Sequence, residues 1–423
     1  MFEKFDNLPL ITRILVFAAP LIFLHPWFAV VPQAGAAEIT IPRLEMASRG
    51  WFEDDEFTIS SRISLDLALT GGYKYSFHLG FAMEAPDIAK AMAIRNVNLA
   101  PLDPADDVLP EHYNALLEKQ NNQAFIGFSV AKATINRIFN LPISLSYFVG
   151  SGDDYCSGDD FTSLFGVNPF GTYYRGFFYF PKGIGGNQIR QYNGIHGAKG
   201  TGLSLSFTGL DHLIIPIIYI YQDFALFPDL FTTGTSMEKF YSGDMRVLMN
   251  WNWLNLEAFW GLSWNSDRDV YTRMGLMFHL AGNGVEFFAQ AGITSWKSGE
   301  KLNVDNMYFL IEPRLRFKYF GVDVTFFYHP VEYLNINEPE ERGMADFNVK
   351  FMFGNQESGF TGGLETTVEL NLGVSDDFML RISPFGSFTS GGLLWEVKIR
   401  LNPTEIKNPK EMMDLFLGIR TAF

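Results

Sequence analysis

The closing stretch of the chain, Leu415-Phe-Leu-Gly-Ile-Arg-Thr-Ala-Phe423, carries the pattern that decides the fold. In an extended strand, successive side chains point to opposite faces. One face therefore carries Leu415, Leu417, Ile419, Thr421 and Phe423, and the other carries Asp414, Phe416, Gly418, Arg420 and Ala422. Such a strand can meet hydrocarbon on one face and water on the other, and it ends on an aromatic residue.

The clearest earlier alternation is a pair of runs at residues 57–69 and 73–83, joined by Thr70-Gly71-Gly72. Each run places Ile, Leu, Phe or Tyr on one face and Ser, Lys, Arg or Asp on the other. A hairpin that spans a membrane explains both runs. Before it, residues 38–46 are expected to form a short strand, and the acidic stretch 51–56 a turn.

Further apolar rows of the same period continue to the C-terminus, and together they predict a large all-β fold. Residues 213–221 are apolar on both faces and fit this pattern less well. The rows lie at 124–134, 141–149, 203–207, 245–251, 254–264, 274–280, 285–293, 307–317, 322–328, 347–353, 364–370, 378–382 and 395–401.

Composition favours one unusual domain over several soluble ones. Aromatic residues make up 16% of the chain and Phe alone numbers 42, whereas only 19% is charged. In a membrane barrel, aromatic side chains face outward, in a lipid-facing band and in belts at the two membrane–water interfaces. No segment after the N-terminal region approaches ~20 uninterrupted apolar residues, so helical spans are not expected. The net charge of −15 argues against a nucleic-acid partner.

The N-terminal region is typical of an export signal. Lys4 and Arg13 precede an apolar run at 14–24, and a small-residue site follows at 33–37. Residues 1–36 are therefore predicted to be a cleaved signal peptide, with 37–423 as a single domain. A retained anchor helix is the alternative, although the apolar run is short for a span.

With its alternating rows and terminal Phe423, the chain resembles the bacterial outer-membrane β-barrels of the porin type. The resemblance implies a transmembrane antiparallel β-barrel of about 18 strands, with 16 as the fallback, because such barrels have even strand numbers. It also implies a location in the bacterial outer membrane, contact with outer-membrane lipid, and recognition of Phe423 by the barrel assembly machinery. A homotrimer is a further expectation. A soluble β-sandwich is the alternative fold, but it leaves the signal and Phe423 unexplained.

Connection lengths predict which end of the barrel faces outward. Short connections are expected at the periplasmic end and long loops at the extracellular end, which places the inserts 85–122 and 151–195 outside. Both termini then lie on the periplasmic side. The short connections are expected near Gly71, Asn140, Asp211, Asn252, Gly282, Phe320, Asn355 and Gly386.

The inward faces of the predicted strands carry charges that suit a water-filled channel. In diffusion porins, which this arrangement resembles, an acidic inward-folded loop faces a basic wall and sets up a transverse field that sorts ions. The hypothesis is that acidic loop residues approach a basic wall at Arg314, Arg316 and Lys318, extended by later strands. The predicted constriction comprises Asp153, Asp154, Asp159 and Asp160 in the loop, and Arg314, Arg316, Lys318, Arg381, Lys398 and Arg400 on the wall. The equally weighted alternative is that lumen charges only solvate and cross-pair the wall.

Other chemistry is less well supported by the sequence. The carboxylates around residues 151–160 suit Ca²⁺ but lack the full spacing of an EF-hand loop, so no metal or cofactor is predicted. None of the histidines, among them His78, His196 and His279, sits in a recognisable triad or metal-ligand spacing, and the protein is predicted not to be an enzyme. A barrel hydrolase and an adhesin or structural barrel with binding loops remain alternatives.

These observations favour a passive channel for small hydrophilic solutes or ions. Carbohydrate uptake is a variant of this interpretation, because the aromatic residues at 173–178 suit a sugar-binding track.

Overall fold

The computed structural model describes most of the predicted strands. The described residues are 38–53, 56–85, 125–168, 170–172, 195–209, 213–223, 240–265, 269–329, 344–354, 359–371, 378–406 and 412–421. The predicted signal peptide, nearly all of the insert 85–122, residues 173–194 and Phe423 lie outside them, so those expectations stay predictions.

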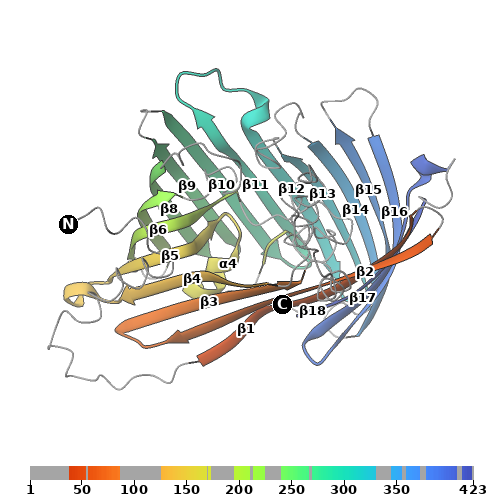
Figure 1. Cartoon of the computed structure of the whole chain (residues 1–423), viewed down its shortest axis with the longest axis horizontal. Coiled ribbons are helices and arrows are strands. Elements are labelled where there is room, and N and C mark those ends of the chain that lie inside the picture. The colour runs from red at the N-terminus through yellow and green to blue at the C-terminus, as the bar shows by residue number, and fades with distance from the viewer. Residues whose placement is uncertain are drawn as a thin grey trace, which may run out of the picture.

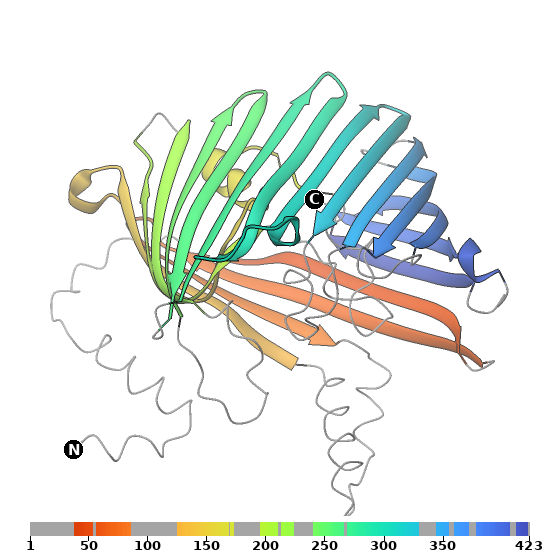
Figure 2. The same cartoon turned by 90° about the horizontal axis from the view of Figure 1, so that it is seen from above.

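Eighteen antiparallel strands form one sheet that closes on itself (Figures 1 and 2), as the alternation predicted. Each strand pairs with its neighbours in sequence, and β1 also pairs with β18, so no edge is left open. The prediction of an all-β antiparallel barrel with 18 strands is therefore confirmed, and the fallback of 16 is not needed.

The strands are β1 (Glu38–Glu53), β2 (Glu56–Gly71), β3 (Tyr75–Ala85), β4 (Phe125–Ile135), β5 (Ile143–Tyr155), β6 (His196–Phe207), β7 (Ile214–Asp223), β8 (Phe240–Trp251), β9 (Leu254–Trp264), β10 (Val270–Gly282), β11 (Val285–Lys297), β12 (Met307–Phe317), β13 (Phe320–His329), β14 (Met344–Gly354), β15 (Phe360–Asn371), β16 (Phe378–Ser390), β17 (Leu393–Leu401) and β18 (Met413–Thr421). One α-helix, α4 (Asp159–Phe165), and three short 3-10 helices at Ile138–Asn140, Val304–Asn306 and Pro403–Glu405 are also described. In the described part of the chain, no helix has the length and apolar character needed to cross a bilayer.

The two ends of the barrel differ in their connections. At the short-turn end, strands are joined by segments such as 252–253, 283–284 and 391–392, and β1 begins and β18 finishes there. The other end, called the long-loop end below, carries the segments 86–124 and 156–195. Asn283 and Gly284 both have positive φ, as a two-residue hairpin turn that matches strand twist requires. Both long inserts share the long-loop end, although the short link between β1 (to Glu53) and β2 (from Glu56) lies there too.

Two boundaries differ from the sequence-based expectation. β1 extends through residues 51–53, where Glu53 pairs with Glu56 of β2, and the register of the two strands shifts between Thr40 and Arg43. Gly386 lies inside β16 opposite Gly362, and the turn comes later, at Gly391 and Gly392. The Phe360 ring lies near both Gly386 and Gly362, so an aromatic side chain covers the gap that these glycines leave.

The two faces of the wall divide as the alternation predicted. On β18, Leu415 and Leu417 are 43% and 54% exposed on the outside, whereas Phe416 between them is 1% exposed on the inside. Outward rows on the other strands are likewise apolar and exposed, and the inward rows hold most of the buried charged side chains. This is the division that a membrane barrel with a polar interior requires.

Candidate functional site

A segment of the chain after β5 folds into the barrel. The inward segment, residues 156–172 without residue 169, begins at Cys156, whose φ of 60° turns the chain away from the strand direction. Helix α4 follows between Gly158 and Gly166, both with positive φ, and Phe161 on it is fully buried. The helix lies on the inner side of the strand wall (Figure 2). The described part of the segment after β5 thus lies inside the strand wall, as the hypothesis of an inward-folded loop requires.

Arg246 on β8 is the first point at which the wall holds this segment. Its Nη1 donates to Asp160 Oδ2 at 2.5 Å, and its Nε donates to Glu257 Oε1 on β9 at 2.6 Å. The guanidinium also lies over the Tyr155 ring, 5.1 Å from its centroid. Burial, opposed in part by Arg246, raises the pKa of Asp160 to about 6. A buried arginine with several acceptors thus fixes the start of the inward segment to β8 and β9.

The backbone of Cys156 is held by the same part of the wall. Its N–H donates to Glu257 Oε1 at 2.6 Å, and its carbonyl accepts from Gln290 Nε2 on β11 at 2.5 Å. Its thiol is fully buried, and burial raises the pKa of that thiol well above its usual value. Cys156 is therefore a structural residue of the turn into the barrel.

The far end of the inward segment is held on β12. Thr172 Oγ1 donates to Glu312 Oε2 at 2.7 Å, and Arg314 donates to the Gly171 carbonyl and to Glu312. Just before this point, the Phe170 ring stacks on His279, with ring centroids 4.3 Å apart. The segment is therefore attached to the inner wall at both of its ends.

An aromatic cluster beneath the segment explains why residues 213–221 are apolar on both faces. Ile215, Ile217, Tyr219 and Tyr221 point inward from β7, and each is 5% exposed or less. They pack in one cluster with Tyr155, Phe161 and Phe259, which come from β5, α4 and β9. The outer face of β7 meets the membrane side and the inner face meets the inward segment, so both must be apolar.

The face of the inward segment that points away from this cluster is polar. Asp159, Thr162, Ser163 and Asn168 are exposed there, whereas Phe161 is buried. This side of the segment therefore presents a carboxylate, hydroxyls and an amide.

The other side of the barrel is lined by paired charges. Around a ring of 18 strands, β17 lies nine strands from β8, which holds the inward segment. Lys398 on β17 donates to Glu365 on β15 at 2.8 Å, and Arg381 donates to Glu369. Arg400 and Arg49 both bind the Asp414 carboxylate, at 2.5 and 2.9 Å. Acids and bases thus cross-pair along this wall.

The structure brings most of the predicted constriction residues together in two groups. In one, loop acids meet residues of β4, β7 and β8, and in the other, wall bases meet acids on neighbouring strands. Asp160 pairs with Arg246, and Asp153 accepts from Lys132 Nζ at 2.9 Å and from the Tyr219 hydroxyl at 2.7 Å. Asp154 lies at the end of β5, and its carbonyl accepts from Arg246 at 3.3 Å. These contacts join the acids to β4, β7 and β8. The hypothesis, in contrast, placed the acids against the basic wall of β12. Arg314 does meet the inward segment, through the Gly171 carbonyl.

Lys318 is not on the inward row with Arg314 and Arg316. It lies in the turn between β12 and β13, is exposed, and sits 5.2 Å from the centroid of the Tyr319 ring. Arg316 is inward and binds Asp323. The strand ends one residue before Lys318, so the alternation stops applying there. The role of all ten residues in a pore stays a prediction.

Sequence reasoning missed Arg246 and Lys132, which hold the acids, and Glu257, which pairs with Arg246 and accepts from the Cys156 N–H. The signal was present: Arg246 alternates with the outward Met245 and Val247, so its inward position follows from the same pattern. A β-bulge between Ser151 and Asp154 hid the orientation of Asp153.

In the part of the chain that the structure describes, no group of ligands supports the calcium alternative. No three His, Cys, Asp or Glu residues there are arranged to hold a metal ion.

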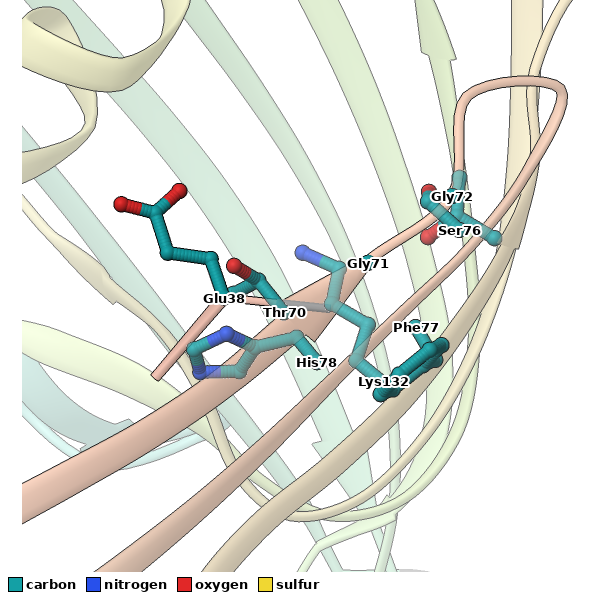
Figure 3. Close-up of a pocket in the computed structure, with 9 residues that line it drawn as sticks. Glu38, Thr70, Gly71, Gly72, Ser76, Phe77, His78 and Lys132 are labelled. Atoms are coloured by element: carbon teal, nitrogen blue, oxygen red, sulfur yellow. The ribbon is translucent and has the colours of Figure 1, made fainter. Parts of the chain in front are cut away.

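A polar pocket of about 380 Å³ opens in the wall at the short-turn end of β1–β4 (Figure 3). His78 on β3 and Lys132 on β4 are direct cross-strand neighbours and reach in side by side, with Thr70 from β2 next to them. Glu38 lines the same space from the start of β1. The remaining lining residues are Gly71, Gly72, Ser76, Phe77 and Thr134.

Comparison with known proteins finds likeness among solved structures alone. No family model and no curated protein matches this chain. A mutant porin of Rh. blastica aligns with a TM-score of 0.42 and 11% identity, over 92% of this chain and 100% of that one. Pseudomonas putida OprB, in its low-pH structure, aligns with a TM-score of 0.39 and 8% identity, over 92% and 93%. At these values the neighbours carry no argument about the function of this chain. The described strands themselves show the porin-type barrel architecture.

Proposed function

We propose that the protein is a passive channel for small hydrophilic solutes or ions in the bacterial outer membrane. The observation that carries this proposal is the contrast between an apolar outer wall and an inner wall of paired charges, within a closed ring of 18 strands. Barrels of 16 to 18 strands are too wide for their wall side chains to fill, and they leave an aqueous channel.

The inward segment supports a channel of restricted width. It is attached at Arg246 and at Glu312 with Arg314, and it presents Asp159 and hydroxyl groups away from the wall. The paired charges on the opposite strands keep that wall hydrated without a large net charge. Ions and small polar solutes would pass between these two surfaces, and larger ones would be excluded.

The location and partners belong to the same proposal. Outer-membrane lipid would cover the apolar rows, and the assembly machinery would recognise the last strand through Phe423. Deleting Phe423 should lower the amount of folded barrel in the outer membrane, and an unchanged amount would remove that partner. We also propose a homotrimer, which cross-linking of the folded protein in membranes tests.

A liposome-swelling series tests the channel proposal. Purified folded protein is placed in liposomes, and swelling is followed in neutral polyols of increasing size. The proposal expects fast swelling in the smallest polyols and a steep fall as the solute grows. Equal, slow swelling at every size, as in protein-free liposomes, would contradict it.

The hydrolase and adhesin alternatives have no specific observation in their favour among the described residues. His196 packs against Tyr155 and Phe259, and His279 stacks on Phe170, so aromatic rings cover both imidazoles. His78 lines the pocket at the short-turn end, and its neighbours there are suited to binding a polar solute.

A further inference from the structure

The pocket at the short-turn end brings opposite charges to one small space. Lys132 supplies an ammonium group from β4 and Glu38 a carboxylate from β1, on either side of the Thr70 position (Figure 3). A volume of about 380 Å³ falls within the ~300–1,000 Å³ range of pockets that hold small molecules. The pocket faces the barrel interior, because His78 and Lys132 are on the inward rows of β3 and β4.

We propose that this pocket binds small zwitterionic solutes, such as α-amino acids, during their passage, an inference that rests on the proposed channel function. The solute carboxylate lies toward Lys132 and the solute ammonium lies toward Glu38. A molecule with no net charge but two separated charges complements a site with the same property.

The Lys132 ammonium has further N–H donors that a solute carboxylate can accept from. An ammonium group carries three N–H donors, and one of them goes to Asp153 Oδ1 at 2.9 Å. Hydroxyl groups extend the donor set: Ser76 accepts from Asn136 at 3.3 Å, and its own proton can point into the pocket. Thr134 lies in register with Ser76 and pairs with Ser146 at 2.8 Å.

Glu38 completes the site from the opposite side. It is exposed, and in the sheet it pairs with Thr70 on β2. Thr70 in turn pairs with His78 on β3. The backbone register therefore holds the acid, the hydroxyl and the imidazole in one line across β1, β2 and β3. His78 offers one donor or acceptor nitrogen, depending on its tautomer, to a bound solute.

Liposome swelling with a matched solute pair tests the proposal. L-alanine is the zwitterionic probe and lactamide is a neutral probe of similar size. We expect the alanine-to-lactamide rate ratio to fall about twofold in Glu38→Gln and in the double variant Lys132→Met/Asp153→Asn. The double variant removes both members of the ion pair, so Asp153 is not left without its cation.

Two control variants lie outside the pocket. Glu405→Gln at a half-buried position and Lys74→Met at an exposed one make the same changes, and the rate ratio should equal that of the wild type. An unchanged ratio in both pocket variants, with swelling intact, would overturn the inference alone. A wild-type protein that supports no swelling in either solute would instead overturn the channel function on which the inference rests.

Discussion

Arg246 Nη1 on β8 lies 2.5 Å from Asp160 Oδ2 on α4, so one buried guanidinium joins the barrel wall to the inward segment. The same guanidinium holds Glu257, which in turn accepts from the Cys156 backbone. Wall and segment are therefore one hydrogen-bonded unit.

Replacing Arg246 should destabilise the barrel strongly. Arg246→Gln leaves the fully buried Glu257 without its cation, and breaking a buried pair in this way costs about 3–5 kcal/mol. The double variant Arg246→Gln/Glu257→Gln should recover the part of that loss that comes from Glu257, because its buried charge is gone, whereas Asp160 still lacks its arginine. Urea unfolding in detergent measures both. A double variant as unstable as the single one would contradict the assigned pair.

Lowering the pH should raise the folding stability of the wild type relative to that of Asp160→Asn. Burial raises the pKa of Asp160 to about 6 in the folded barrel, so the folded state binds this proton more tightly than the unfolded chain does. The stabilisation from this proton is present at low pH and is lost as pH rises through 6. The wild type should therefore gain stability relative to Asp160→Asn between pH 8 and pH 5. Asp159→Asn, on the exposed side of the helix, is the matched control. A stability difference between wild type and Asp160→Asn that stays flat with pH would refute the role of Asp160.

The sequence predicted most of the wall because a period of two is a local property. Each outward row, such as Leu415 to Ile419, could be identified without knowing its partner strand. The inward segment could not be placed in this way, since its position depends on the distant residues Arg246 and Arg314. The bulge near Asp153 and the turn at Lys318 shifted or ended the alternation, and only the structure locates them.

The thiol of Cys156 should be inert in the folded barrel. It is fully buried and burial raises its pKa, so both access and thiolate content are low. We expect labelling by a water-soluble thiol reagent to be at least ~100-fold slower in the folded than in the unfolded protein. Ser163→Cys in a Cys156→Ser background places a thiol on the exposed side of α4 and should react quickly. Rapid labelling of Cys156 in the folded protein would show that the inward segment is not held as described.

Ion preference should respond to inward charges and not to Lys318. Arg381→Gln removes a cation from the inner wall beside Glu369 and should move the reversal potential in a salt gradient toward cation preference. Lys318→Gln removes the same charge from the exposed turn, outside the inner wall, and should leave that potential close to the wild-type value. Equal shifts for the two variants would mean that the inner wall does not set selectivity.

Single-channel recording in a planar bilayer tests the central claim most directly. Purified, folded protein should produce discrete, ion-permeable openings of uniform size, and heat-unfolded protein from the same preparation should produce none. Folded protein that inserts into the bilayer and yet passes no current would contradict the channel.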